Sequence, residues 1–157
     1  MGLDFGTLSV RAVVVDAVEG KTVSEAVCEY AHGVMDSTFL DGTPLKPKSA
    51  LQHPKDYLDS MYSAINESLA SARLSSDNIA AVGVDFTGST VLPIYKDGTP
   101  LCFDEKYSGE PNAYVKLWKA HAAEEQANRV TALAKERGEK WLAEYSGKVS
   151  SEWMLIP

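Results

Sequence analysis

The chain of 157 residues is poor in the residues that cross-link small secreted domains or hold metal ions. It has two cysteines, Cys28 and Cys102, which form no CxxC motif, and three histidines without a metal-ligand spacing. We therefore expect neither a disulfide scaffold nor a protein-held zinc site. We expect a reducing compartment, the cytoplasm. No secretion signal is visible, and no apolar run approaches the length of a membrane span.

Positive charge is also scarce. The formal net charge is −7, and the 15 lysines and arginines form no cluster. Nucleic acid and anionic membrane surfaces are therefore disfavoured as partners. With 45% hydrophobic and 24% charged residues, the composition is that of a soluble globular protein, and the length suits one domain with a core of useful size.

Apolar patterning predicts an α/β fold, with a mixed β-sheet and flanking helices. The expected strands are residues 9–17, 22–30 and 79–85, followed by a strand pair, 91–95 and 100–103, around an Asp-Gly turn. Helices are expected from Pro54 and from Pro111 to about residue 137, and residues 32–52 form a long excursion without a period. A plain Rossmann unit is disfavoured, because strands and helices do not alternate and GxGxxG is absent.

The stretch GVDFTGST, residues 83–90, has the spacing of a phosphate-binding P-loop but lacks its lysine. A strand-like segment follows it, where a P-loop needs a helix N-terminus, so that assignment is disfavoured. Two interpretations stay open. The stretch is either a tight turn in which Gly88 supplies backbone freedom, or a substrate loop at the carboxyl end of a strand.

The stretch DFGTLS, residues 4–9, places an acid, a glycine and two hydroxyls at a strand-turn-strand corner, with Arg11 just beyond. Such a turn can direct backbone N–H groups and a hydroxyl at a phosphate, and an aspartate suits Mg²⁺. The alternative is an ordinary hairpin turn. Elsewhere, His53 is expected at a helix entry, and His32 has no identifiable partner.

Several stretches carry a resemblance to a known family. DFGTLS and the apolar strand after it resemble the first phosphate motif of the actin, Hsp70 and sugar-kinase superfamily, and GVDFTGST resembles the sugar-side loop of the FGGY carbohydrate kinases. LQHPKDY (51–57), VKLWKAHAA (115–123) and GKVSSEWM (147–154) resemble the ribulokinase branch of that family. The resemblance implies a ribonuclease-H-like fold, with residues 1–157 forming an incomplete N-terminal domain whose C-terminal partner domain is absent.

The resemblance also implies an activity for the complete enzyme. That activity is transfer of a phosphoryl group from ATP, with Mg²⁺, to L-ribulose or a similar pentulose, giving ribulose 5-phosphate in L-arabinose catabolism. The family's catalytic base is an aspartate of the second domain, so no catalytic residue is expected in this chain, and the chain alone is expected to be inactive. The alternatives are a kinase for xylulose, ribitol or glycerol, or a non-catalytic, actin-like nucleotide-binding domain. Assembly into a homo-oligomer also stays open.

For ATP phosphates and Mg²⁺, the resemblance implies one metal-organising acid, Asp4, and a phosphate-binding turn. The residues expected at this site are Asp4, Gly6, Thr7, Ser9 and Arg11. Leu8 departs from relatives that carry a hydroxyl at its position. For Ser9 and Arg11 the alternative is that they are solvent-facing strand residues.

For the sugar, the resemblance implies contacts from the loop after the strand and from one further residue. The residues expected there are Asp85, Thr87, Gly88, Ser89 and Lys119. The alternative for Asp85 is a loop-stabilising acid, and for Lys119 a solvent-facing helix surface with Trp118 in the core. Ala120 and Ala122 stand where many relatives carry an aspartate and an arginine.

Overall fold

The computed structural model describes residues 1–153, so Met154, the last residue of GKVSSEWM, lies outside the described part. The chain divides into two compact units. The first unit comprises Met1–Val34 and His53–Gly88, and the second comprises Met35–Gln52 and the chain from Ser89 onward. Both contain helices and strands, which confirms the α/β class. In the described part, no helix is both long and apolar enough to cross a membrane.

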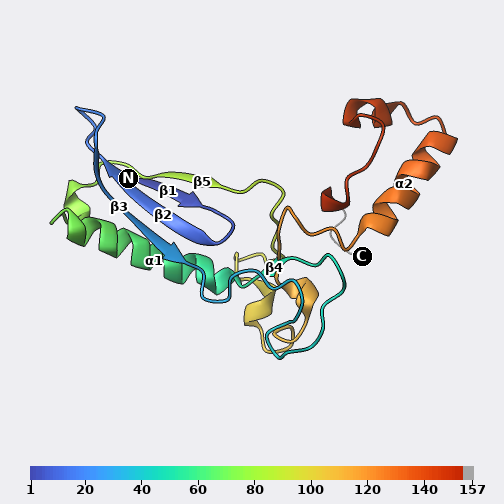
Figure 1. The fold of residues 1–157 in the computed structure, drawn as a ribbon, viewed down its shortest axis with the longest axis horizontal. Helices are drawn as coiled ribbons and strands as arrows, with labels where there is room; N and C mark the ends of the chain where they lie inside the picture. The colour runs from blue at the N-terminus through green and yellow to red at the C-terminus, as the bar shows by residue number, and fades with distance from the viewer. Residues whose placement is uncertain (154–157) are drawn as a thin grey trace. The chain divides into compact units, whose positions relative to one another are not determined.

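The first unit is built on a four-stranded mixed sheet, in the order β3-β2-β1-β5 (Figure 1). Its strands are β1 (Gly2–Phe5), β2 (Ser9–Val15), β3 (Thr22–Glu29) and β5 (Gly83–Phe86). Strand β2 pairs antiparallel with both β1 and β3, whereas β5 runs parallel to β1. The valine-rich runs form strands as predicted, although the strand expected at 79–85 begins only at Gly83.

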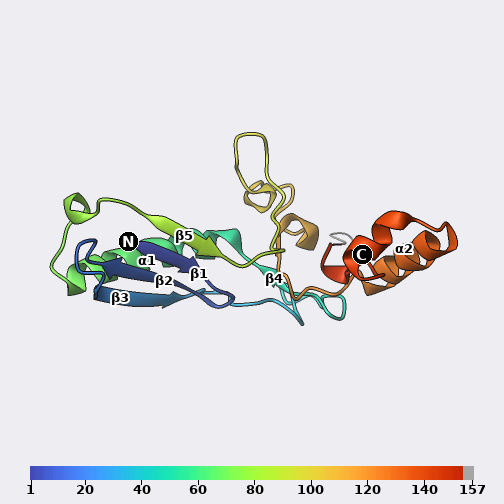
Figure 2. The same ribbon diagram turned by 90° about the horizontal axis from the view of Figure 1, so that it is seen from above.

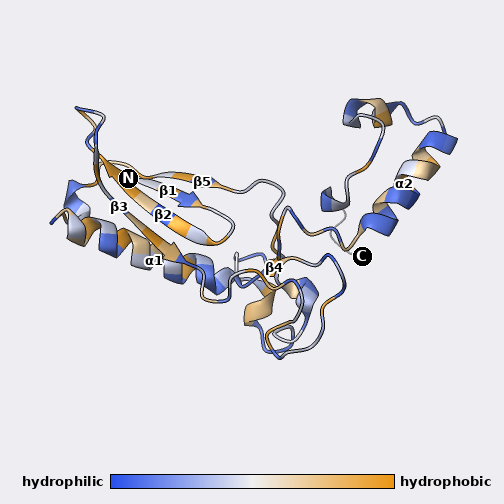
Figure 3. Cartoon of the chain, in the orientation of Figure 1, coloured by the Kyte–Doolittle hydropathy of each residue, from blue (hydrophilic) through white to orange (hydrophobic). Residues whose placement is uncertain are grey.

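Helix α1 (Pro54–Ser71) covers one face of this sheet, along β2 and β3 (Figures 1 and 2). Its small buried residues allow close approach, and Ala64 is fully buried against Leu3 and Ala12. Figure 3 shows apolar residues along the strands and alternating bands of polar and apolar residues along α1. The apolar face of the helix therefore meets the sheet, as its periodicity predicts.

The second unit has a smaller sheet, in which β4 (Leu51–Gln52) pairs antiparallel with β6 (Val115–Lys116). Its buried core lies beside this sheet and consists of Met35, Phe39, Leu51, Cys102, Ala113 and Tyr114. Helix α2 (Glu124–Glu136) follows, with two glutamates in its first turn and Lys135 in its last, as the helix dipole favours. Short 3₁₀ turns connect these elements, at Leu101–Phe103, Pro111–Ala113, Lys140–Tyr145 and Ser151–Trp153.

The prediction of a helix starting at Pro111 is wrong for residues 114–123. Hydrogen bonds to distant segments hold residues 115–117 extended: Lys116 N–H donates to Val91 O (2.9 Å) and Leu117 N–H to Ala50 O (3.0 Å). Turns follow at residues 118–119 and 122–123. The core residue is Leu117, 2% exposed, whereas Trp118 is 42% exposed. Lys119 therefore does not lie on a helix surface, and Trp118 does not anchor the core.

The strand pair predicted around the Asp-Gly turn is reduced to its turn. Tyr95 N–H donates to Thr99 O (2.8 Å), which closes the turn as predicted. Beyond it, a single bridge joins Ile94 to Pro100, and residues 101–103 form a 3₁₀ turn. Leu101 N–H donates to Pro93 O (3.0 Å), but Pro93 has no N–H to donate back to Leu101 O, which accounts for the early end of the pairing.

Candidate functional site

The turn between β1 and β2 is held by backbone and side-chain hydrogen bonds. Gly6 N–H donates to Ser9 O (2.9 Å), and the N–H of Tyr30 donates to Leu8 O (2.9 Å). The Tyr30 hydroxyl donates to the Gly6 carbonyl oxygen (3.1 Å). A Cβ on Gly6 would lie 3.4 Å from Ser9 O, an ordinary van der Waals contact, so neither space nor a positive φ requires a glycine here. The predicted turn therefore exists as a braced structure.

On the sheet face opposite α1, three charged residues lie side by side. Asp4 of β1 is opposite Arg11 of β2 and beside Asp85 of β5. All three side chains are exposed, and they line a shallow depression together with Gly2 and Gly83. Carboxylate oxygens are ligands that Mg²⁺ prefers, and a guanidinium favours phosphate. The arrangement can therefore bind a hydrated cation and an anion together.

Asp85 also serves the local backbone. Its Oδ1 atom accepts a hydrogen bond from the N–H of Phe86 (2.9 Å). This contact supports the loop-stabilising alternative, while the register beside Asp4 supports a role at the sheet face. The two roles are compatible, because a carboxylate has several acceptor positions.

The loop after β5 turns at Gly88 and Ser89, as the tight-turn interpretation predicts, but Gly88 does not have the role that this interpretation gives it. The residue with left-handed backbone is Ser89 (φ 53°), and Gly88 is not among the residues with positive φ. A Cβ on Gly88 would meet no atom within 4 Å. Gly88 is therefore not required for backbone freedom. Residues 89–95 contain no helix, as the argument against a P-loop predicts.

The structure brings together one part of the predicted site residues. The first unit contains Asp4, Arg11 and Asp85 on one sheet face and Gly6, Thr7 and Ser9 in and beside the turn. Thr87 and Gly88 follow β5 in the same unit, whereas Ser89 and Lys119 belong to the second unit.

Sequence spacing missed a cluster of His32, His53 and Asp56. The buried Asp56 carboxylate accepts the backbone N–H of His32 (2.9 Å) and lies 2.8 Å from His32 Nδ1. The two imidazole rings are stacked, with centroids 4.9 Å apart. His53 caps α1, as predicted, because its Nδ1 accepts the N–H of Lys55 (3.2 Å). The prediction that His32 has no identifiable partner is therefore wrong. It missed Asp56 because a partner 24 residues away leaves no local pattern.

One ligand atom from each of these three residues lies within 4.8 Å of the others, a separation that would allow a shared metal ion. The hydrogen bonds give these atoms structural roles, since both Asp56 oxygens face His32 and His53 Nδ1 faces the helix backbone. We interpret the cluster as a link between the segment after β3 and the start of α1.

This cluster predicts a pH-dependent stability. Burial, and then the charge on His32, lowers the pKa of His53 below its ordinary value of 6.5. The unfolded chain therefore binds more protons, so stability is lost as pH falls from about 7.5 through 6.5 toward the lowered pKa. His53→Asn keeps a helix-capping oxygen and removes the titration, and we expect a flatter pH profile of the melting temperature between pH 7.5 and 5.5. An equally steep profile in the variant would contradict this origin.

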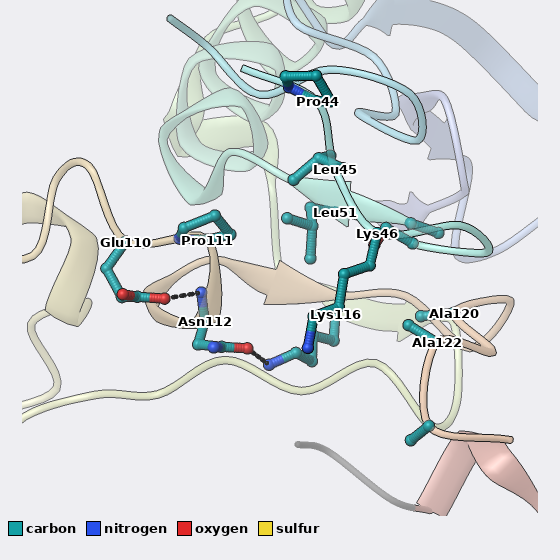
Figure 4. Close-up of a pocket in the computed structure, with 13 residues that line it drawn as sticks. Pro44, Leu45, Lys46, Leu51, Glu110, Pro111, Asn112, Lys116, Ala120 and Ala122 are labelled. Carbon is teal, nitrogen blue, oxygen red and sulfur yellow. Dashed lines mark hydrogen bonds between the residues drawn. The ribbon is translucent and has the colours of Figure 1, made fainter. Parts of the chain in front are cut away.

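The second unit contains a cavity of about 240 Å³ (Figure 4). Its apolar wall includes Leu45, Leu51 and Pro111, and its polar side includes Lys46 and Lys116. Lys116 Nζ donates to Asn112 Oδ1 (2.8 Å), and the backbone N–H of Asn112 donates to Glu110 Oε1 (3.1 Å). No local pattern indicates this cavity, since its residues come from separate segments, 44–51 and 110–123. Ala120 and Ala122 of VKLWKAHAA also line it, but Lys119 does not.

No model of a known protein family matches the chain. Individual relatives do. The chain is 48% identical over 156 residues to a ribulokinase of Shouchella clausii, covering 99% of this chain and 28% of the relative. It is 46% identical over 149 residues to a ribulokinase of Bacillus licheniformis (94% and 27%) and 45% identical over 156 residues to one of Mycolicibacterium smegmatis (98% and 28%). The chain thus spans little more than a quarter of the length of these curated relatives.

Among solved structures, the chain resembles a xyloylose kinase from Brucella ovis. The TM-score is 0.63 at 18% sequence identity, and the match covers 87% of this chain and 24% of that one. At this identity the likeness shows a shared fold, which is that of part of a sugar kinase. The sequence matches extend along almost the whole chain and include every stretch that carries the predicted resemblance. Over almost its whole length the chain is therefore similar in sequence to about a quarter of several curated ribulokinases, the branch that those stretches resemble.

Proposed function

We propose that this chain is the N-terminal, sugar-side part of an ATP-dependent kinase that phosphorylates L-ribulose to ribulose 5-phosphate. The observation that carries the proposal is the braced turn after β1, next to the face that bears Asp4, Arg11 and Asp85. The relatives named ribulokinase support the substrate. A role in L-arabinose catabolism, in the cytoplasm, is part of the same proposal.

We further propose that the first unit has the ribonuclease-H-like fold of the actin, Hsp70 and sugar-kinase superfamily. The support is the strand order β3-β2-β1-β5, in which β3, β2 and β1 pair antiparallel, β5 is parallel to β1, and α1 packs along β2 and β3. In this proposal, residues 1–157 are an incomplete N-terminal domain, and a C-terminal domain completes the enzyme. The relatives' greater length supports that arrangement.

The residues present fit ATP phosphates and Mg²⁺. Asp4 supplies an exposed carboxylate, and Arg11, directly opposite, supplies a positive charge. Gly6 and Thr7 would hold a phosphate through the turn, with Ser9 beside them. Mg²⁺, when bound, neutralises charge on the transferred phosphoryl group.

The contribution of this chain to catalysis is binding and orientation. The turn and the sheet face would fix the phosphates, while Thr87, Gly88 and Ser89, with Lys119 as a further contact, would orient the sugar. Asp85 would support the loop that begins after β5. The base that takes the proton from the sugar hydroxyl is expected in the C-terminal domain, so this chain alone would bind and not phosphorylate.

The proposal is tested by ADP release from the complete kinase, with ATP and Mg²⁺, against L-ribulose, xylulose, ribitol and glycerol. Turnover highest with L-ribulose, and none with residues 1–157 alone, is the expected result. A preference for another sugar would keep the kinase and correct its substrate. Absence of sugar-dependent ADP release would favour a non-catalytic nucleotide-binding domain, and release by residues 1–157 alone would contradict the assignment of the base to the missing domain.

A further inference from the structure

We infer that Tyr30 is a positioning residue for the phosphate-binding turn, a role that rests on the proposed function. Tyr30 comes directly after β3 and lies outside every stretch that resembles the kinases. Its backbone N–H and its hydroxyl both donate hydrogen bonds to the turn, to Leu8 O (2.9 Å) and Gly6 O (3.1 Å). One residue thus fixes two peptide groups on either side of Thr7.

The hydroxyl bond determines which way the turn presents its donor. In a trans peptide the C=O and the following N–H point in opposite directions. Because the Gly6 carbonyl points toward Tyr30, the N–H of Thr7, in the same peptide plane, points away from Tyr30. The orientation of the Gly6–Thr7 peptide, and with it the backbone geometry that the turn presents to a phosphate, therefore depends on Tyr30.

Tyr30 is itself held firmly. It is 5% exposed, and its ring lies edge-on to Tyr57 of α1, with centroids 5.1 Å apart. The Tyr57 ring in turn lies edge-on to the ring of Phe5, the last residue of β1, with centroids 6.2 Å apart. Burial, followed by the negative charges of Asp4 and Asp56, raises the pKa of Tyr30 to about 12, so the hydroxyl remains a donor at neutral pH. The ring contacts therefore hold the Tyr30 hydroxyl in position next to the Gly6 carbonyl.

Tyr30→Phe in the complete kinase tests this role, because it removes one oxygen atom and keeps the ring contacts. We expect the KM for MgATP to rise about fivefold, in line with the loss of one buried hydrogen bond, while the KM for the sugar stays within about twofold. Calorimetric titration with MgATP should show the same weakening without turnover. The control is Tyr62→Phe, since Tyr62 is an exposed tyrosine of α1 (61%).

Three results would overturn the inference. An unchanged KM and Kd for MgATP would show that the hydroxyl does not position the turn. An equal rise of both KM values, with a melting temperature several degrees below that of Tyr62→Phe, would show a structural role only. A wild-type kinase without sugar-dependent ATP consumption would remove the proposed function and this inference with it, whereas the first two results leave the proposed function intact.

Discussion

Asp4→Asn in the complete kinase is expected to lower kcat/KM by about 10- to 100-fold, an effect typical of losing a group that orients a catalytic metal. The amide has the shape of the carboxylate but not its charge, and Asp4 lies at the centre of the sheet between Arg11 and Asp85. The Mg²⁺ concentration for half-maximal rate should rise as well. Steady-state kinetics across a Mg²⁺ titration measure both effects.

The matched control for this variant is Asp97→Asn. Asp97, like Asp4, is an exposed acid, but it lies in a turn of the second unit. Its carboxylate accepts the N–H of Thr99 (3.0 Å), a bond that the asparagine oxygen can retain. We expect normal kinetics from the control. If Asp4→Asn and Asp97→Asn had the same kcat/KM and the same Mg²⁺ dependence, Asp4 would have no role at the metal.

Gly88→Arg is expected to raise the KM for the sugar about 10- to 100-fold, the range of discrimination that changes in pocket shape produce. The structure makes this a clean test of the loop. Gly88 has no left-handed backbone, and a Cβ there meets no atom within 4 Å, so the fold should tolerate the substitution. The KM for MgATP should remain within about twofold, because the substitution leaves the β1–β2 turn unchanged.

Gly88→Ala is the control for Gly88→Arg. It adds a single methyl group to the same backbone, and we expect less than about a threefold change in the KM for the sugar. Initial rates at varied sugar and saturating MgATP separate the two variants. A sugar KM that Gly88→Arg leaves unchanged would remove Thr87, Gly88 and Ser89 from the proposed sugar site.

Local patterns in the sequence sufficed for the elements that local forces decide. The valine-rich β2 and the proline-led α1 are found where they were predicted, because alternation, helical spacing and a capping residue act within a few positions. For the segment 111–123, the same local patterns predict the wrong structure. Val115, Trp118 and Ala122 have helical spacing, but pairing with Val91 and Ala50 decides the conformation, and that pairing has no local signature.

The same distinction applies to the candidate site. The turn at residues 6–9 could be predicted, because glycine, threonine and serine between two apolar runs favour a turn. That Asp4 and Asp85 share one sheet face follows only from the parallel pairing of β1 with β5, which no pattern within either strand specifies. The bonds from Tyr30 to the turn depend on the return of β3 beside β2, which is also non-local.

The parallel pairing of β5 also limits which changes in length the chain can accept. Side chains alternate between sheet faces, so one residue inserted between Gly83 and Asp85 would turn Asp85 toward the α1 side and away from Asp4. The connection before β5, residues 72–82, has no such constraint. Its bond to β1 is at its end, where the Met1 amino group donates to Ala81 O, next to the bond from Gly83 N–H to Met1 O. Homologous chains should therefore vary in length before β5 and keep a fixed length within it.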